Sequence, residues 1–152
     1  MKLNLLEYAA MNSKIRAFHQ RKVETRILRE LSDLPNNKKI LEIGCGNGYG
    51  TYLINEFFKP SEINAIDFDP RMIKKARKSA SKRDLLHVNY QEASVTALPF
   101  DNDEFDAIID YGILHHIPNW EDAIKECKRV LKKGGQFILD DLSLDTWGTF
   151  WG

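Results

Sequence analysis

The stretch that decides the fold is Ile40-Leu41-Glu42-Ile43-Gly44-Cys45-Gly46-Asn47-Gly48-Tyr49-Gly50. A short apolar run ends in alternating glycines and a helix-compatible segment follows, which is typical of a strand, a tight turn and the start of a helix. Glycines at such a turn allow positive φ and let a ligand approach the main chain. N–H groups at the start of the helix would face a polar or anionic group of that ligand. The stretch therefore predicts a small-molecule site as well as a fold.

The spacing of the glycines excludes two familiar phosphate-binding turns. A phosphate loop of the G-x-x-x-x-G-K-[ST] type needs a lysine that the run Gly48-Tyr49-Gly50-Thr51 lacks. The dinucleotide fingerprint G-x-G-x-x-G fails as well, because it would need glycine at Tyr49 or at Thr51. Taken alone, these residues indicate a nucleoside-type ligand on a Rossmann-like turn.

Composition favours one domain without a strong charge preference. The chain has 152 residues, enough for one real core, and 22 basic residues balance 22 acidic ones. Basic residues crowd positions 14–29 and 71–83 and acidic ones crowd 101–110, which we interpret as solvated faces. The two cysteines lie far apart without metal-ligand spacing, and no apolar run approaches the length of a membrane span. We expect a cytoplasmic protein.

The remaining pattern alternates strands with helices. Asp69-Pro70 begins a helix, and Asn119 with Asp122 three residues later predicts a capping box. Gly134-Gly135 is expected to end the helix that Asn119 begins. We expect helices over 13–34, 49–58, 70–80 and 119–131, a turn over 98–103, and strands over 40–43, 63–66, 85–90, 105–110 and 136–140. This alternation predicts an α/β fold with a parallel sheet and right-handed crossovers, whose ligands bind at the carboxyl ends of the strands.

Asp67 closes the second expected strand, about twenty residues after the glycine turn. A carboxylate there can accept hydrogen bonds from both hydroxyls of a ribose. Phe68 follows it, and either an adenine face or plain core packing would suit this ring.

The ordered set of motifs resembles the class I S-adenosylmethionine-dependent methyltransferases, in particular the methyltransferase type 11 kind. The resemblance extends from about Lys38 to Asp141. It implies a Rossmann-like sheet of order 3-2-1-4-5, S-adenosylmethionine as cofactor with S-adenosylhomocysteine as product, and methyl transfer to a small-molecule acceptor. The motifs are Glu42-x-Gly44-x-Gly46-x-Gly48, Asp67, Leu98-Pro99-Phe100, His115-His116 and Val130-Leu131-Lys132-Lys133-Gly134-Gly135.

The resemblance also assigns roles within the site. Glu42 would help to orient the turn and the amino group of the ligand, and Tyr111 would contact the methionine part. On the adenine side Ser94 stands where the family has an acid, so Ser94 with the Val95 N–H, or Glu92, would serve the base. The expected cofactor-binding residues are Glu42, Gly44, Cys45, Gly46, Gly48, Asp67, Phe68, Ser94, Val95 and Tyr111.

Several expectations concern what the site does not contain. Cys45 is expected to fill space in the turn rather than to react. Neither a metal nor a catalytic residue is assigned, since adjacent histidines do not project to one point and methyl transfer needs a base only if the acceptor must lose a proton.

The family normally has two further strands after the fifth, and the chain has no residues left for them after residue 152. We therefore expect a truncated or minimal domain whose fifth strand is an open edge, with a homodimer formed through that edge or the aromatic tail. The expected parts are an N-terminal helical segment (1–37), a cofactor-binding core (38–142) and an aromatic tail (143–152). A binding module without turnover and a nucleic-acid methyltransferase remain the alternatives. The glycine spacing disfavours a nicotinamide dehydrogenase.

Overall fold

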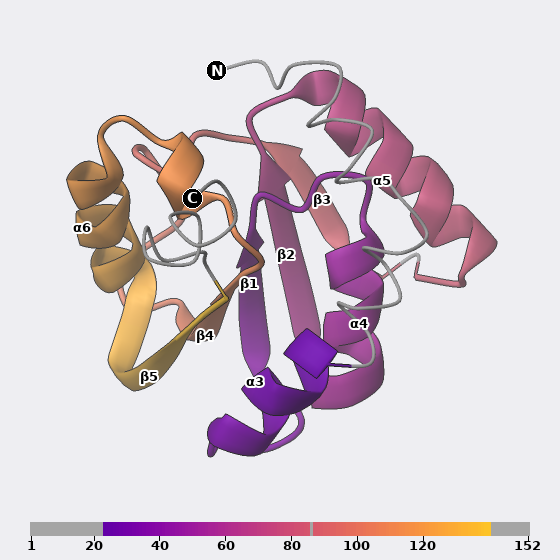
Figure 1. Cartoon of the computed structure of the whole chain (residues 1–152), viewed down its shortest axis with the longest axis horizontal. Coiled ribbons are helices and arrows are strands. Elements are labelled where there is room, and N and C mark those ends of the chain that lie inside the picture. Colours follow the sequence, from indigo (N-terminus) through magenta and orange to yellow (C-terminus); the bar gives the residue numbers. More distant parts are fainter. Residues whose placement is uncertain (1–22, 86, 141–152) are drawn as a thin grey trace, which may run out of the picture.

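The structure, a computed structural model, describes residues 23–85 and 87–140 as one sheet flanked by helices (Figure 1). A short 3-10 helix, η2 (Leu114–His116), precedes the last α-helix. The α-helices are α3 (Thr25–Leu31), α4 (Tyr49–Phe58), α5 (Pro70–Lys82) and α6 (Trp120–Val130). The strands are β1 (Lys39–Ile43), β2 (Glu62–Asp67), β3 (Asn89–Glu92), β4 (Phe105–Asp110) and β5 (Leu131–Leu139).

The sheet has five parallel strands in the order β3-β2-β1-β4-β5, which confirms the predicted fold class and strand order. β1 lies in the middle and pairs with β2 on one side and with β4 on the other. Strands of such a sheet are covered on both faces, so they read as continuous apolar runs such as Ile108-Ile109. Their parallel direction brings all their carboxyl ends to one edge.

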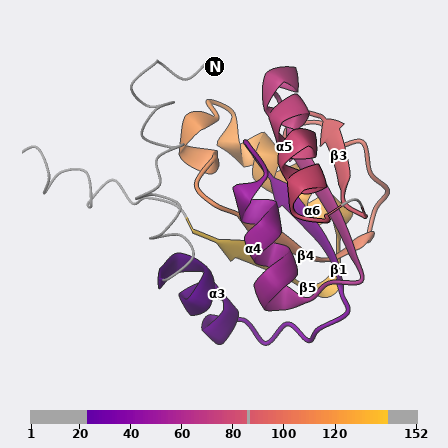
Figure 2. The same cartoon turned by 90° about the vertical axis from the view of Figure 1, so that its right-hand side faces the viewer.

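Two apolar cores lie on opposite faces of this sheet. On one face Leu28 of α3, Phe58 of α4 and Ala76 of α5 pack together with alternate strand residues. On the other face Cys127 and Val130 of α6 pack against the complementary set of strand residues. Figures 1 and 2 show the same layering, with α4 and α5 on one side of the strands and α6 on the other.

Most predicted elements of the core are confirmed. β1, α4, β2, α5 and β4 lie where the pattern placed them. The side chain of Asp69 caps α5 by accepting a hydrogen bond from the Arg71 N–H, and Pro70 occupies the first turn. Of the helix predicted over 13–34, residues 23–34 are described, and α3 ends at Leu31, three residues before the predicted end. The residues before Val23 lie outside the described ranges, as does the aromatic tail.

The prediction for the third strand was wrong by several residues. The strand was expected over 85–90, and β3 spans Asn89–Glu92. Leu85 and Val88 are buried, but they sit in a turn in which the Leu85 N–H donates to the Ala80 carbonyl and the Val88 N–H to the Leu85 carbonyl. Their apolar character serves the core rather than a strand.

Two predictions near α6 were also wrong. Asn119 precedes the helix, but its side chain makes no capping hydrogen bond; its main-chain carbonyl accepts the Asp122 N–H instead. The helix ends at Val130, and β5 begins at Leu131 and includes Gly134-Gly135. The register passes from Phe105↔Leu131 directly to Ala107↔Gln136, so the glycines belong to a bulge in β5 and not to a helix stop.

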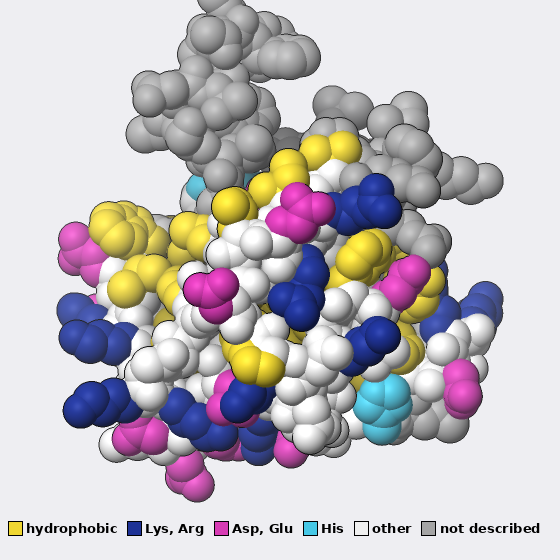
Figure 3. All heavy atoms as spheres, turned by 90° about the horizontal axis from the view of Figure 1, so that it is seen from below, with side chains coloured by type: hydrophobic (Ala, Val, Ile, Leu, Met, Phe, Trp, Pro, Cys, Tyr) yellow, Lys and Arg dark blue, Asp and Glu magenta, His cyan; other side chains and the backbone are white. Residues whose placement is uncertain are grey.

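The surface carries both signs of charge. Figure 3 shows basic and acidic side chains interspersed on the face that it views. Near the start of the strands Lys39 makes ion pairs with both Glu62 and Glu104, at 3.1 and 2.9 Å. Among the residues that the structure describes, no helix is long and apolar enough to cross a membrane.

Candidate functional site

The predicted site residues come together at the carboxyl edge of the sheet. Ile43, the last residue of β1, is aligned with Ile66 of β2 and with Asp110 of β4. Asp67 is aligned with Glu92 at the end of β3. The glycine turn, Asp67 and the segments that follow β3 and β4 therefore border one region of the molecule.

Three glycines of the turn have positive φ: +71° at Gly44, +53° at Gly46 and +82° at Gly48. A side chain at Gly44 would lie 2.1 Å from Cγ2 of Ile113, and one at Gly48 would lie 3.1 Å from Cα of Ala76. At Gly46, by contrast, a side chain would meet no atom of the described residues within 4 Å. A side chain at Gly44 would thus overlap Ile113 and one at Gly48 would be in tight contact with Ala76, while Gly46 borders space that no described residue fills.

Asp67 is fixed to this turn by its carboxylate. Oδ2 accepts the Gly46 N–H and Oδ1 accepts the Asp69 N–H, each at 2.9 Å. A carboxylate offers about four lone-pair positions, so both oxygens can accept further hydrogen bonds. Partial burial raises the pKa of Asp67, and the two N–H donors oppose that effect. The result is an oriented acceptor pair next to the open side of Gly46.

Phe68 and Glu92 are the exposed neighbours of Asp67. The Phe68 side chain is 71% exposed, so this ring is not part of the core and core packing is the wrong explanation for it. Glu92 is also exposed. Both side chains are available to a ligand beside Asp67, and their contact with adenine stays a prediction.

Glu42 lies beneath the turn and is only 2% exposed. The Thr51 hydroxyl donates to its Oε2, and a side chain at Gly50 would lie 2.3 Å from its Oε1. Burial raises the pKa of Glu42 to about 8; the nearby Asp67 and Asp110 carboxylates act in the same direction, and Thr51 opposes them. Glu42 thus joins the end of β1 to the first turn of α4, and its buried carboxyl holds a proton more strongly than an exposed one does.

Tyr111 turns toward the N-terminal helix rather than into open space. Its hydroxyl lies 3.2 Å from the Thr25 hydroxyl of α3. Its ring packs against Gly50, where an added side chain would lie 2.9 Å from the ring. The side chain is buried, which raises the pKa of its hydroxyl. A contact between Tyr111 and the methionine part of a ligand stays a prediction.

Cys45 has a structural position in the turn. Its N–H donates to the Ile66 carbonyl at 2.9 Å, which joins the turn to β2. The thiol is buried, and burial with the nearby Glu42 and Asp67 carboxylates raises its pKa. A protonated, buried thiol is a poor nucleophile, in agreement with the space-filling interpretation.

The segment after β3 carries the two residues that were assigned to adenine. Ser94 Oγ lies 2.8 Å from the Thr96 hydroxyl, and the Ala97 N–H donates to the Ser94 carbonyl at 3.1 Å. The Val95 side chain packs into the core on the α6 face. Ser94 and Val95 therefore occupy a tight turn held by its own hydrogen bonds.

The rings of the two histidines after β4 lie close together and are tilted by 45° to each other. The rings of His115 and His116 have centroids 3.8 Å apart. Within the described ranges no three His, Cys, Asp or Glu side chains are grouped so that they could hold a metal ion.

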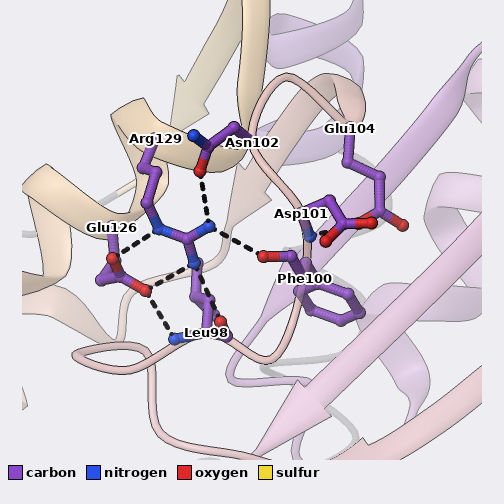
Figure 4. Close-up of polar contacts among 7 residues, drawn as sticks. All are labelled: Leu98, Phe100, Asp101, Asn102, Glu104, Glu126 and Arg129. Atoms are coloured by element: carbon purple, nitrogen blue, oxygen red, sulfur yellow. Dashed lines mark hydrogen bonds and ion pairs between the residues drawn. The ribbon is translucent and has the colours of Figure 1, made fainter.

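Sequence reasoning missed two residues of α6 that hold the segment after β3. Glu126 and Arg129 bind each other and the main chain around Leu98 (Figure 4). Their spacing of three residues on a helix indicates an ion pair, but nothing in the sequence shows which distant loop the pair contacts.

A family profile described as "Methyltransferase domain" matches residues 41–139. The chain belongs to this methyltransferase family. Among similar curated proteins, a demethylmenaquinone methyltransferase of Staphylococcus carnosus is 30% identical over 94% of this chain and 58% of its own length. A phthiotriol/phenolphthiotriol dimycocerosates methyltransferase of Mycobacterium leprae is 31% identical over 70% of the chain and 38% of its own length. The chain thus spans about half of the length of the curated relatives that it matches.

Solved structures agree with this assignment. The BH2331 protein from Bacillus halodurans superposes with a TM-score of 0.74 at 26% identity, covering 84% of this chain and 56% of that one. The PH0226 protein from Pyrococcus horikoshii has the same TM-score and identity, with 94% and 62% covered. The resemblance stated from the motifs is therefore confirmed at the level of family and fold.

The cofactor of this methyltransferase family is S-adenosylmethionine, and the described residues fit it. Its ribose carries two vicinal hydroxyls, which suit the spare acceptor positions on the oriented carboxylate of Asp67. The missing side chain at Gly46 leaves room for a ligand beside the main chain.

Proposed function

We propose that this chain is a methyltransferase domain that transfers a methyl group from S-adenosylmethionine to a small-molecule acceptor. One observation carries the proposal: the Asp67 carboxylate is held by the Gly46 and Asp69 N–H groups beside open space at the glycine turn. The oriented carboxylate keeps spare acceptor positions, which suit the two vicinal hydroxyls of a ribose.

In this proposal each group at the edge of the sheet has a separate task. Asp67 accepts both ribose hydroxyls, Phe68 covers one face of adenine, and Ser94 with the Val95 N–H serves the adenine edge. Glu42 and Tyr111 support the turn and α4 from below, through Thr51, Thr25 and Gly50. Gly44 and Gly48 allow the close packing, and Cys45 ties the turn to β2.

The proposed methyl transfer needs no covalent bond between the protein and the reactants. When bound, S-adenosylmethionine supplies a methyl group on a positively charged sulfur that is already a good leaving group. The chain's own residues have to hold the donor in line with the acceptor, and such approximation supplies much of the rate. No nucleophilic side chain is needed, in keeping with the buried and protonated thiol of Cys45.

The acceptor is proposed to be a small organic molecule because the relatives named above are named for such substrates. Those names include demethylmenaquinone and the phthiotriol dimycocerosates, and another relative, from Mycolicibacterium smegmatis, is a fatty-acid O-methyltransferase. These substrates are lipids or lipid-like quinones, so apolar acceptors are the first ones to test.

The direct test follows a radiolabelled methyl group from S-adenosylmethionine into an organic extract. Demethylmenaquinone and a long-chain fatty acid serve as acceptors, and DNA and RNA serve as comparison substrates. The proposal predicts label in one of the small molecules and none in the nucleic acids. Labelled nucleic acid would overturn the acceptor class.

A second candidate function is binding of S-adenosylmethionine without methyl transfer. One structure of similar fold, the [4+2]-cyclase SpnF, is named for a different reaction; it has a TM-score of 0.68 at 26% identity, covering 74% of this chain and 41% of that one. Calorimetry with S-adenosylmethionine separates the two candidates. Binding that is never accompanied by formation of S-adenosylhomocysteine, with any acceptor, would favour the second.

A further inference from the structure

The segment between β3 and β4 has almost no regular structure, although it carries Ser94 and Val95. Within it the structure describes only the isolated bridge between Ser94 and Ala97. Its first residue is held by a hydrogen bond from the Ala93 N–H to the Asp67 carbonyl, at 3.1 Å. The side chains of Val95 and Leu98 are buried against α6. Apolar packing alone would leave the main-chain groups around Leu98 without partners, which is costly for buried backbone.

Arg129 supplies those partners from the side of α6 (Figure 4). Its Nη2 donates to the Leu98 carbonyl at 2.9 Å, and its Nη1 donates to the Phe100 carbonyl at 2.8 Å and to Asn102 Oδ1 at 3.0 Å. Nε and Nη2 also donate to the two oxygens of Glu126, at 2.7 and 2.8 Å. A guanidinium has five N–H donors in a planar fork, so each donor has an acceptor here.

Glu126 completes the arrangement by accepting the Leu98 N–H at 2.8 Å through the same Oε2 that binds Arg129. Both main-chain groups of Leu98 are thus bound to one ion pair on α6. The ion pair thus supplies the main-chain hydrogen bonds that a neighbouring strand would otherwise supply to Leu98. Its two side chains are 33% and 22% exposed, so the geometry of the hydrogen bonds matters more than the attraction of the charges.

The segment is therefore fixed at two points, at Asp67 on one side and at the Glu126–Arg129 pair on the other. Ser94 and Val95 lie between these points, in the turn closed by the hydrogen bond from the Ala97 N–H to the Ser94 carbonyl. We propose that Glu126 and Arg129 are positioning residues: by holding Leu98 and Phe100 they set the placement of Ser94 and Val95, and through it the recognition of adenine. This inference rests on the proposed function, because it assumes that S-adenosylmethionine binds at this edge.

The test removes the planar set of N–H donors at Arg129 and keeps the positive charge of the side chain. Arg129→Lys retains a cation but cannot reproduce five directed donors. Calorimetry then compares S-adenosylhomocysteine with its inosine analogue, in which the exocyclic amino group of adenine is replaced. We expect Arg129→Lys to weaken binding of S-adenosylhomocysteine by about tenfold, equivalent to the loss of about one or two hydrogen bonds. Binding of the inosine analogue should change much less, so the preference for adenine shrinks.

Lys125→Gln is the matched control. Lys125 also makes an ion pair three residues away on α6, with Asp122 at 2.8 Å, but this pair is exposed and, among the described residues, contacts no other segment. The control should leave both affinities unchanged.

Hydrogen exchange of the ligand-free protein gives a second readout that does not depend on binding. Amides over residues 94–102 should exchange faster in Arg129→Lys, while those of β1 and α4 keep their protection. If Arg129→Lys does not fold, Glu126→Gln, which preserves shape and weakens the pair, takes its place in both measurements.

The outcomes separate the inference from the proposed function. Unfolding of both variants, an unchanged preference for adenine, or an equal loss for both ligands would overturn the positioning role. Failure of the unaltered protein to bind S-adenosylhomocysteine would instead remove the proposed function, on which the inference depends.

Discussion

Gly44 and Gly46 both have positive φ, but a side chain would meet different surroundings at the two positions. At Gly44 it would overlap Ile113, whereas at Gly46 it would enter open space. Gly44→Ala should therefore lose roughly 1–3 kcal/mol of stability through overpacking, in addition to about 1–2 kcal/mol from the backbone conformation.

Gly46→Ala should lose only the backbone contribution to stability, about 1–2 kcal/mol, yet bind S-adenosylmethionine far more weakly. Urea unfolding and calorimetry of both variants check this separation. Equal losses of stability, or unchanged binding by Gly46→Ala, would contradict the view of Gly46 as a ligand contact.

Glu42 makes stability depend on pH. Its pKa of about 8 in the folded protein exceeds the ordinary value of 4.5, so the folded state holds a proton that the unfolded state releases. Stability should therefore fall as the pH rises from about 4.5 to about 8, by on the order of 1 kcal/mol per pH unit.

Glu42→Gln removes this titration while preserving the shape of the side chain. Urea unfolding at pH 5 and pH 8 should show a fall in stability for the unaltered protein that the variant lacks. An equal change in stability between pH 5 and pH 8 for the two proteins would mean that Glu42 has an ordinary pKa in the folded state.

At the scale of elements, α5 and α6 each follow a polar residue, but only α5 has a side-chain cap. Asp69 caps α5 through its side chain, whereas Asn119 makes no such bond before α6. Asp69→Ala should cost about 1 kcal/mol, and Asn119→Ala should stay within about 0.5 kcal/mol of the unaltered protein. Thermal unfolding of the pair checks this, and an equal effect would indicate a side-chain cap at Asn119.

The elements that could be predicted from sequence are those whose apolar pattern and end signals both lie within the element or directly beside it. β1, β2 and β4 are apolar on both faces, and α5 begins at an Asp-Pro pair. β3 could not be placed because buried Leu85 and Val88 resemble strand residues while lying in a turn. The end of α6 was misplaced because glycines that usually end helices here form a bulge.

The same distinction applies to the site. Asp67 and the glycine turn are close in sequence to the elements that position them, so the pattern placed them at one edge. The Glu126–Arg129 pair acts on a loop about thirty residues away, and its partners at Leu98 and Phe100 are main-chain atoms without a sequence signature. Contacts of this kind become visible only in the folded structure.

At the scale of the whole molecule, β5 lies at one edge of the described sheet. In the described part of the chain it pairs with β4, and Leu139 near its end is 46% exposed. A strand at the edge of a sheet can pair with a strand of another chain, so we propose self-association of this chain through β5. Light scattering across a range of concentrations should show dimers, and a monomer at every concentration would contradict this proposal.

The central claim is that the edge formed by the glycine turn and Asp67 binds S-adenosylmethionine. Calorimetric titration of the unaltered protein and of Asp67→Asn with this ligand tests it most directly, with NAD as the comparison. We predict binding of S-adenosylmethionine to the unaltered protein, a loss of roughly 1.5–3 kcal/mol in the variant, and no binding of NAD. Absence of S-adenosylmethionine binding together with binding of NAD, or equal affinity in Asp67→Asn, would contradict the claim.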